Sequence, residues 1–221
     1  MVMDLNVEGR SERIPPGSHI CQMYSKVTEI SAVTAHLLQI GLKSGEKCLF
    51  AASAEQVEQL HEDLQKVHVD VVTCIASGQL ILTDDKAPFL SKDGRFDPYY
   101  LLSTHQTFVA HALKEGWKGA RISIDMNWLV NDVTPPEKVL KYEAASDAVF
   151  TFQGIPIIAL MHYDYQKILA ANLVVDLLKL HPIAVVGKFI RRNPYYMNSE
   201  DYMLKILRFR KGKQDLDNGM Q

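Results

Sequence analysis

The chain has 221 residues, of which 47% are hydrophobic and 23% charged, and its formal net charge is −2. This length suits one large domain with a substantial core, and the near-neutral charge excludes a bulk electrostatic attraction to nucleic acid or to membranes. The three cysteines lack paired spacing and no apolar stretch approaches the roughly 18 residues of a membrane span, so we expect a cytoplasmic protein that does not cross a membrane.

The first half of the chain alternates short apolar runs with segments of helical periodicity. Residues 1–17 mix charges and prolines and predict an irregular lead-in. We then expect strands over 19–24, 48–52 and 80–83, separated by helices over 27–42 and 54–67. The predicted order is β-α-β-α-β.

The second half continues this alternation. We expect helices over 98–115, 136–150 and 166–180, and strands over 121–126, 155–161 and 183–186. Strands that are apolar on both faces and alternate with helices are typical of a mostly parallel sheet with helices on both faces, a three-layer α/β/α fold. A basic amphipathic helix over 202–213 follows, and its charges suit either a solvated helix face or a partner-binding surface.

The chain lacks the phosphate-binding loop of nucleotide-binding α/β domains. The motif G-x-x-x-x-G-K-[ST] places glycine amides around the phosphates and a lysine beyond them. The glycine-lysine pairs at 187–188 and 212–213 fail this motif, because Pro182 and Leu207 stand where the first glycine should be. Residues 23–28, which follow the first predicted strand, contain no glycine. We therefore expect no NTP hydrolysis.

Polar and aromatic residues follow the predicted strands, and ligands of parallel sheets bind at the carboxyl ends of strands. These residues are Tyr24, Ser53, Asp84, Asp85, Asp125, Asn127, Trp128, His162, Tyr163 and Asp164. For single residues such as Asp125, a cap or turn role is an open alternative, and Trp128 suits the core as well as a pocket wall. The run His162-Tyr163-Asp164 offers an imidazole, a phenol and a carboxylate, more chemistry than a turn needs.

Metal binding and nucleophilic catalysis are rival interpretations. Candidate transition-metal ligands are His19, Cys21, Cys74, His162, Asp164 and His181. Their spacing gives a weak signal for a metal site, and a strand cysteine such as Cys48 is typical of inert packing. The nucleophile motif G-x-S-x-G does not occur. We therefore expect no metal, no cofactor, no catalytic residue and no enzymatic activity.

Several short segments stand in a fixed order along most of the chain. They include HICQMYS near the start, GLKSGEKCLF, VDVVTCIASGQLILTDD, DGRFDP at 93–98, HYD at 162–164 and NPYY at 193–196. Together they resemble the MEDS domain, the methanogen/methylotroph DcmR sensory domain, over about residues 18–203. The resemblance implies a sensory module for small organic molecules, found in transcriptional regulators and signalling proteins, with a degenerate RecA/KaiC-like fold.

We therefore expect one RecA/KaiC-like sensory domain over residues 18–203, followed by a basic helix and frayed tail over 204–221. The predicted function is non-catalytic binding of a small organic ligand at the strand carboxyl ends. The residues expected to contact the ligand are Tyr24, Asp125, Trp128, His162, Tyr163 and Asp164, with Tyr142 and Glu143 behind them.

The output of such a sensor would lie in signal transduction or transcriptional regulation. It would pass through a regulator or kinase partner, through self-association into a homo-oligomer, or through an output domain outside this chain. The domain itself is not expected to bind nucleic acid or membranes. Two alternatives stay open, namely a degenerate ATPase-like nucleotide-binding protein and an oligomeric protein-interaction scaffold.

Overall fold

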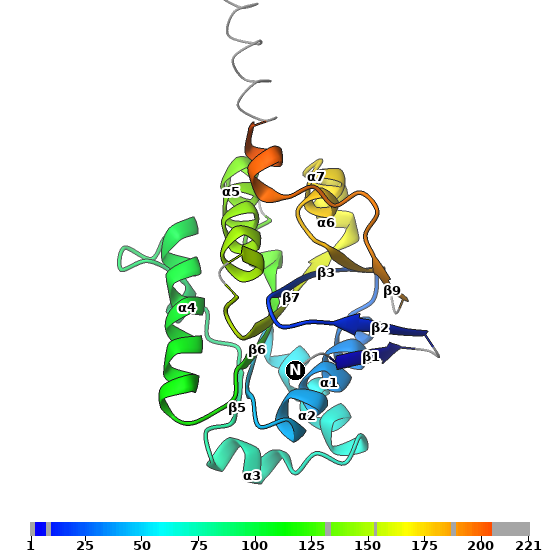
Figure 1. Ribbon diagram of the computed structural model, residues 1–221, viewed down its shortest axis with the longest axis vertical. Helices are drawn as coiled ribbons and strands as arrows, with labels where there is room; N and C mark the ends of the chain where they lie inside the picture. The colour runs from blue at the N-terminus through cyan, green and yellow to red at the C-terminus, as the bar shows by residue number, and fades with distance from the viewer. Residues whose placement is uncertain (1–2, 8–9, 131–133, 153, 187–188, 205–221) are drawn as a thin grey trace, which may run out of the picture.

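The computed structural model describes residues 3–7, 10–130, 134–152, 154–186 and 189–204, and a seven-stranded sheet forms its centre (Figure 1). The strand order is β5-β4-β6-β7-β3-β8-β9. The strands are β3 (Ser18–Tyr24), β4 (Lys47–Ala51), β5 (Leu80–Thr83), β6 (Ala120–Asp125), β7 (Ile157–Asp164), β8 (Ile183–Val186) and β9 (Phe189–Arg192). Each neighbouring pair is parallel except β8 with β9, so the predicted mostly parallel sheet is confirmed.

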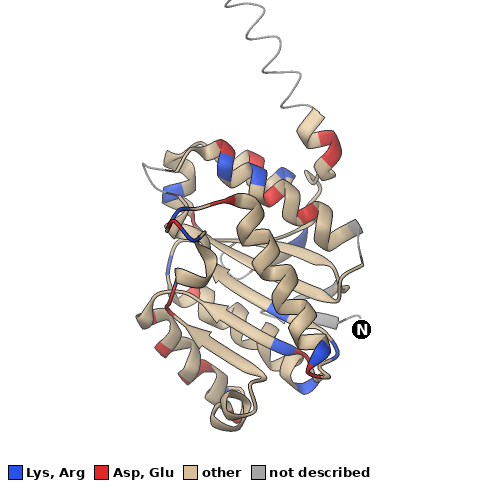
Figure 2. Ribbon diagram, turned by 90° about the vertical axis from the view of Figure 1, so that its left-hand side faces the viewer, with Lys and Arg blue, Asp and Glu red and all other residues tan. Residues whose placement is uncertain are grey.

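Helices cover both faces of this sheet. One face carries α1 (Thr28–Lys43), α2 (Ala54–Lys66) and α3 (Val71–Ala76), and the other carries α4 (Pro98–Lys114), α5 (Pro136–Asp147), α6 (Tyr165–Ala170) and α7 (Val174–Lys179). Leu38 of α1 shares a buried apolar cluster with Phe50 of β4, whereas Val139 of α5 clusters with Ile122 of β6. The acidic and basic residues gather on the helices and loops, and most of the sheet is drawn tan (Figure 2). The fold is therefore the predicted three-layer α/β/α arrangement.

Strand register brings several predicted site residues to one edge of the sheet. Tyr24 at the end of β3 pairs with Asp164 at the end of β7, and Asp125 at the end of β6 pairs with His162. Helical turns follow the ends of β6 and β7 directly, and the side chain of Asp164 caps α6 by accepting bonds from two backbone N–H groups. The connection from β7 into α6 is thus fixed by a cap.

Parts of the predicted element order were wrong. The lead-in over 1–17 contains an antiparallel hairpin of β1 (Met3–Val7) and β2 (Arg10–Ile14), whose polar sequences MDLNV and RSERI lack an apolar run. The predicted helix over 166–180 is two helices, because Asn172 takes a left-handed conformation with φ of 54° between α6 and α7. Helix α3 and strand β9 were missed, since six and four residues are too few to show a period.

The predicted basic tail over 204–221 lies outside the described residues, except for Leu204. Within the described part of the chain, no helix is both long and apolar enough to cross a membrane.

Candidate functional site

A cleft with a volume of about 340 Å³ opens at the carboxyl ends of the central strands. Four of the six side chains predicted to contact a ligand line it. Tyr24 comes from the end of β3, Asp125 from the end of β6 and Asp164 from the end of β7. Trp128 comes from η2 (Met126–Trp128), the 3₁₀ turn that follows β6. The structure therefore brings these four residues together at the edge where parallel sheets bind ligands.

Asn127 links the strand ends at this edge, although it was not among the residues predicted to contact a ligand. Its side-chain amide donates to the phenol oxygen of Tyr24, and its side-chain oxygen accepts a 2.8 Å bond from the backbone N–H of Asp164. Its own backbone N–H donates to the Asp125 carboxylate at 3.0 Å. One residue therefore links the ends of β3, β6 and β7, and only the register of these strands could have identified it.

The cleft combines acidic, basic and phenolic groups. Burial raises the pKa of the Asp125 carboxyl. This rise is only partly opposed by the Asn127 N–H, the Gln56 side chain and two nearby lysines. Those lysines, Lys86 and Lys167, also line the cleft. Burial likewise raises the pKa of the Tyr24 phenol, so this group stays protonated and can donate a hydrogen bond. Such a site can orient a polar group of either charge.

Trp128 also lines a second cavity of similar volume, about 340 Å³. The second cavity is lined by Phe96, Arg95, Pro135 and Lys138. The rings of Phe96 and Trp128 meet edge to face with their centroids 6.0 Å apart, a favourable aromatic contact. Trp128 thus contributes apolar surface to both cavities.

His162 does not reach the cleft, because it lies inside β7 rather than in the predicted loop after it. Its ring is fully buried on the α1 face of the sheet, with Nε2 2.6 Å from the Ser123 hydroxyl and Nδ1 2.8 Å from the Gln22 side-chain oxygen. Burial lowers the pKa of His162 to about 3. The prediction that His162 sits in a strand-end loop was wrong, and the ring belongs to a buried polar network.

Tyr163 points to the opposite face, since successive strand residues alternate. Its hydroxyl donates to the carboxylate of Glu143 on α5, and both residues are fully buried. Tyr142 is also fully buried, with its hydroxyl 3.2 Å from Nδ1 of His105. Burial lowers the pKa of His105 to about 3. These groups form an interior polar cluster of their own, away from the cleft-lining side chains.

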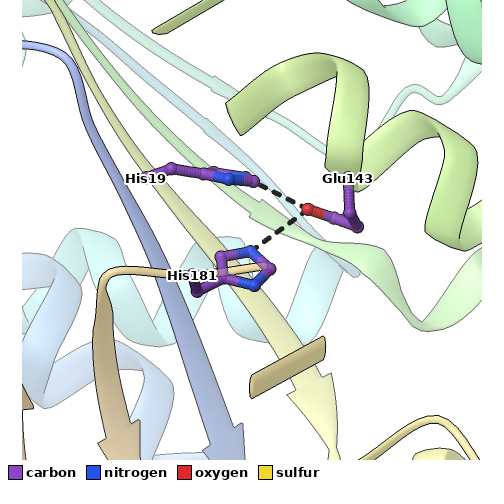
Figure 3. Close-up of side chains that lie close together, drawn as sticks. All are labelled: His19, Glu143 and His181. Atoms are coloured by element: carbon purple, nitrogen blue, oxygen red, sulfur yellow. Dashed lines mark ion pairs between the residues drawn. The ribbon is translucent and has the colours of Figure 1, made fainter. Parts of the chain in front are cut away.

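Two histidines flank Glu143 in that cluster (Figure 3). Nε2 of His19 and Nε2 of His181 each lie 3.1 Å from Oε2 of Glu143. Burial lowers the pKa of His19, and the neighbouring His181 adds to this effect. Burial also opposes ionisation of Glu143, but its contacts with the two histidines outweigh burial and lower the pKa of the carboxyl.

A protein-family model described as the methanogen/methylotroph DcmR sensory domain, MEDS, matches residues 18–182. The chain belongs to this family. The matched segment begins at Ser18, the first residue of β3, and ends at Pro182, just before β8. The MEDS segment therefore contains the five strands β3–β7 and every predicted site residue.

Among curated proteins, this MEDS chain is similar to a protein that is named as a transcriptional repressor. The chain is 27% identical over 166 residues to the transcriptional repressor DcmR of Methylorubrum extorquens (strain DSM 6343 / CIP 106787 / DM4). The alignment covers 74% of the chain and 57% of the repressor. The chain thus matches little more than half of the length of this relative.

Proposed function

We propose that the chain is a non-catalytic sensory domain that binds a small organic ligand in the cleft beside Trp128 and acts in transcriptional regulation or signal transduction. The observation that carries the proposal is the convergence of Tyr24, Asp125, Trp128 and Asp164 on one cleft at the strand carboxyl ends. Membership of a family described as a sensory domain, and similarity to a protein named as a repressor, support the regulatory role.

The proposed ligand is small and carries both an apolar and a polar part. A volume of about 340 Å³ lies at the lower end of the range for small-molecule sites. Trp128 would contact the apolar part, while Asp125, Asp164 and the protonated Tyr24 would orient the polar group. The hydroxyl of Ser53 is engaged in the capping box that begins α2, and none of the described residues that line the cleft is a histidine. This chemistry favours binding without catalysis.

A ligand can signal only through different affinities for two states of the protein. Asn127 offers the point of action, because its bonds join the ends of three strands next to the proposed ligand. A ligand group that replaces one of these bonds would shift the η2 turn. The output would then pass to a regulator or kinase partner, to a second copy of the chain or to a domain outside this sequence.

The two tryptophans allow a direct test. The purified protein is screened by thermal shift against small alcohols, amines, carboxylates and halogenated hydrocarbons, and native mass spectrometry identifies any co-purified compound. For a compound that binds, Trp128→Ala should weaken binding by about tenfold or more, the loss expected for a contact of about 1.4 kcal/mol or more. Trp117→Ala is the matched control, because Trp117 precedes β6 at the amino end of that strand and should leave affinity unchanged.

Three outcomes would contradict the proposal. Binding that Trp128→Ala and Asn127→Ala both leave intact would locate the ligand elsewhere. A thermal shift with ATP or ADP plus magnesium and with no other compound would favour the degenerate nucleotide-binding alternative. No shift with any compound at millimolar concentration, together with a stable oligomer, would favour an interaction scaffold.

A further inference from the structure

Three side chains from distant parts of the sequence converge on one point beneath α5. His19 lies near the start of β3, Glu143 lies on α5, and His181 lies between α7 and β8 (Figure 3). Their ligand atoms all lie within 4.8 Å of one another, and all three residues are 0% exposed. This cluster is remote from the cleft, because five residues of extended strand, about 17 Å, separate His19 from Tyr24.

The converging atoms lack hydrogen bonds. Among the residues that the structure describes, Nε2 of His19, Nε2 of His181 and Oε2 of Glu143 have no partner of hydrogen-bond geometry, although the N···O distances are 3.1 Å. Buried polar atoms are nearly always paired, and an unpaired one costs about 1–3 kcal/mol. Two imidazole nitrogens and one carboxylate oxygen thus face one another at one point without well-oriented hydrogen bonds between them.

His181 and Glu143 each have an outer contact that leaves one atom facing the centre of the cluster, whereas Nδ1 of His19 has no hydrogen-bond partner among the described residues. Nδ1 of His181 lies 2.7 Å from the carbonyl oxygen of Leu177, which can only accept, so Nδ1 carries a proton, and in the neutral ring Nε2 presents a lone pair. Tyr163 donates to Oε1 of Glu143, which leaves Oε2 for the centre of the cluster. Metal-binding histidines and carboxylates commonly have such outer hydrogen bonds.

We propose that His19, Glu143 and His181 bind one divalent transition-metal ion through two imidazole nitrogens and one carboxylate oxygen. Tetrahedral zinc with bonds of about 2.0–2.1 Å holds its ligand atoms about 3.3 Å apart, close to the two 3.1 Å separations between Glu143 and the histidines, and all three ligand atoms lie within 4.8 Å of one another. Imidazole ligands favour zinc, iron, nickel or copper over magnesium or calcium. The ion would join β3, α5 and the α7–β8 connection.

This site departs from the sequence-based expectation that the chain has no metal. Of the six candidate ligands in the sequence, His19 and His181 belong to the cluster. His162 lies in the buried polar network on the α1 face of the sheet, and Asp164 lies at the cleft. Glu143 was not among those candidates. The alternative occupant is a proton, since one protonated imidazole would also pair with the carboxylate, and the experiment must separate the two.

The test measures metal binding by the full chain at pH 7.5. The protein is stripped with a chelator, titrated with zinc and with cobalt, and analysed by inductively coupled plasma mass spectrometry, with cobalt absorption bands reporting the ligand geometry. We expect one ion per chain and a higher melting temperature. Glu143→Gln and His181→Gln should each weaken binding by more than about 100-fold, beyond the 10–100-fold typical of losing an outer contact. His162→Gln is the buried-histidine control and should bind like the unsubstituted chain.

Failure of the stripped, unsubstituted chain to bind zinc or cobalt at micromolar concentrations would overturn the proposal in favour of a proton-linked cluster. Stoichiometric binding that survives both Glu143→Gln and His181→Gln would place the ion elsewhere and overturn it too. If the variants do not fold, X-ray absorption of the zinc-loaded unsubstituted chain decides. Scattering from two imidazoles would support the site, and its absence would refute it.

Discussion

Replacement of His162 should make the stability of the protein less sensitive to acid. In the structure this imidazole is neutral and has partners on both nitrogens. The side-chain amide of Gln22 donates to the carbonyl oxygen of Glu29 at 2.9 Å, so its oxygen faces His162 and accepts the proton of Nδ1. Nε2 then accepts from the Ser123 hydroxyl at 2.6 Å. Protonation would turn Nε2 into a donor and would place a charge in the core.

The size of the effect follows from the two pKa values. The folded ring has a pKa lowered to about 3 by burial, against 6.5 for an ordinary histidine. As the pH falls below 6.5, His162 becomes protonated in the unfolded chain but stays neutral in the folded chain. The stability that this group contributes above pH 6.5 is therefore lost on acidification. Between pH 7 and pH 5 the loss due to His162 is about 2 kcal/mol, because pH 5 is about 1.5 units below the unfolded pKa and each unit is worth about 1.4 kcal/mol.

Urea unfolding between pH 5 and pH 7.5, followed by tryptophan fluorescence, gives the free energy of unfolding for the unsubstituted chain and for His162→Gln. The variant should be less stable at pH 7, since it loses a buried hydrogen bond, but the difference should shrink by about 2 kcal/mol at pH 5. Other buried histidines, such as His105, act equally in both proteins and cancel. His111→Gln replaces an exposed histidine and serves as the control. Parallel pH profiles for His162→Gln and the unsubstituted chain would refute the reasoning.

Three further substitutions test a packing contact, a buried ion pair and a helix cap. Gly41→Ala should destabilise the protein by about 1 kcal/mol, because the new methyl would lie 2.6 Å from a side-chain carbon of the buried Arg121. The cost of overpacking, about 1–3 kcal/mol, exceeds the gain of about 1 kcal/mol in helix propensity. Greater stability of the variant on urea unfolding would contradict this. Glu46→Gln should cost about 3 kcal/mol, since Arg121 would keep its buried charge without the carboxylate, and a loss below about 1 kcal/mol would mean that other contacts carry that charge. Asp97→Ala should lower the free energy of unfolding by about 1 kcal/mol, because it removes the side chain that caps α4. Asp93→Ala replaces an exposed aspartate and is the control. Equal effects of the two substitutions would argue against capping.

The order of the main elements was predictable because their signals are local. The apolar run of β7 and the helical spacing of α1 appear in the sequence itself, and the alternation of such elements implies a parallel sheet. The hairpin of β1 and β2 was not predictable in this way. Its strands are short and polar, and they are recognisable as strands only through their pairing with each other.

The site was predictable in part. The rule that ligands bind at the carboxyl ends of parallel strands identifies an edge of the sheet, but it does not say in which direction each side chain points. Tyr24, Asp125 and Asp164 are terminal strand residues and do line the cleft. The role of Asn127 depends on distances between three strands, which the sequence does not contain. The pairing of Glu143 with His19 joins residues 124 positions apart, and neither has a spacing motif that links it to the other.

The segment His162-Tyr163-Asp164 explains why the prediction and the structure differ. Because a strand alternates its faces, three consecutive residues serve three environments: a polar network under α1, the carboxylate of Glu143 under α5, and the cleft. Buried hydrogen bonds thus hold the end of β7 on both faces. If the proposed ligand contacts Asp164, it would therefore meet a strand that is held on both faces, next to the three hydrogen bonds of Asn127.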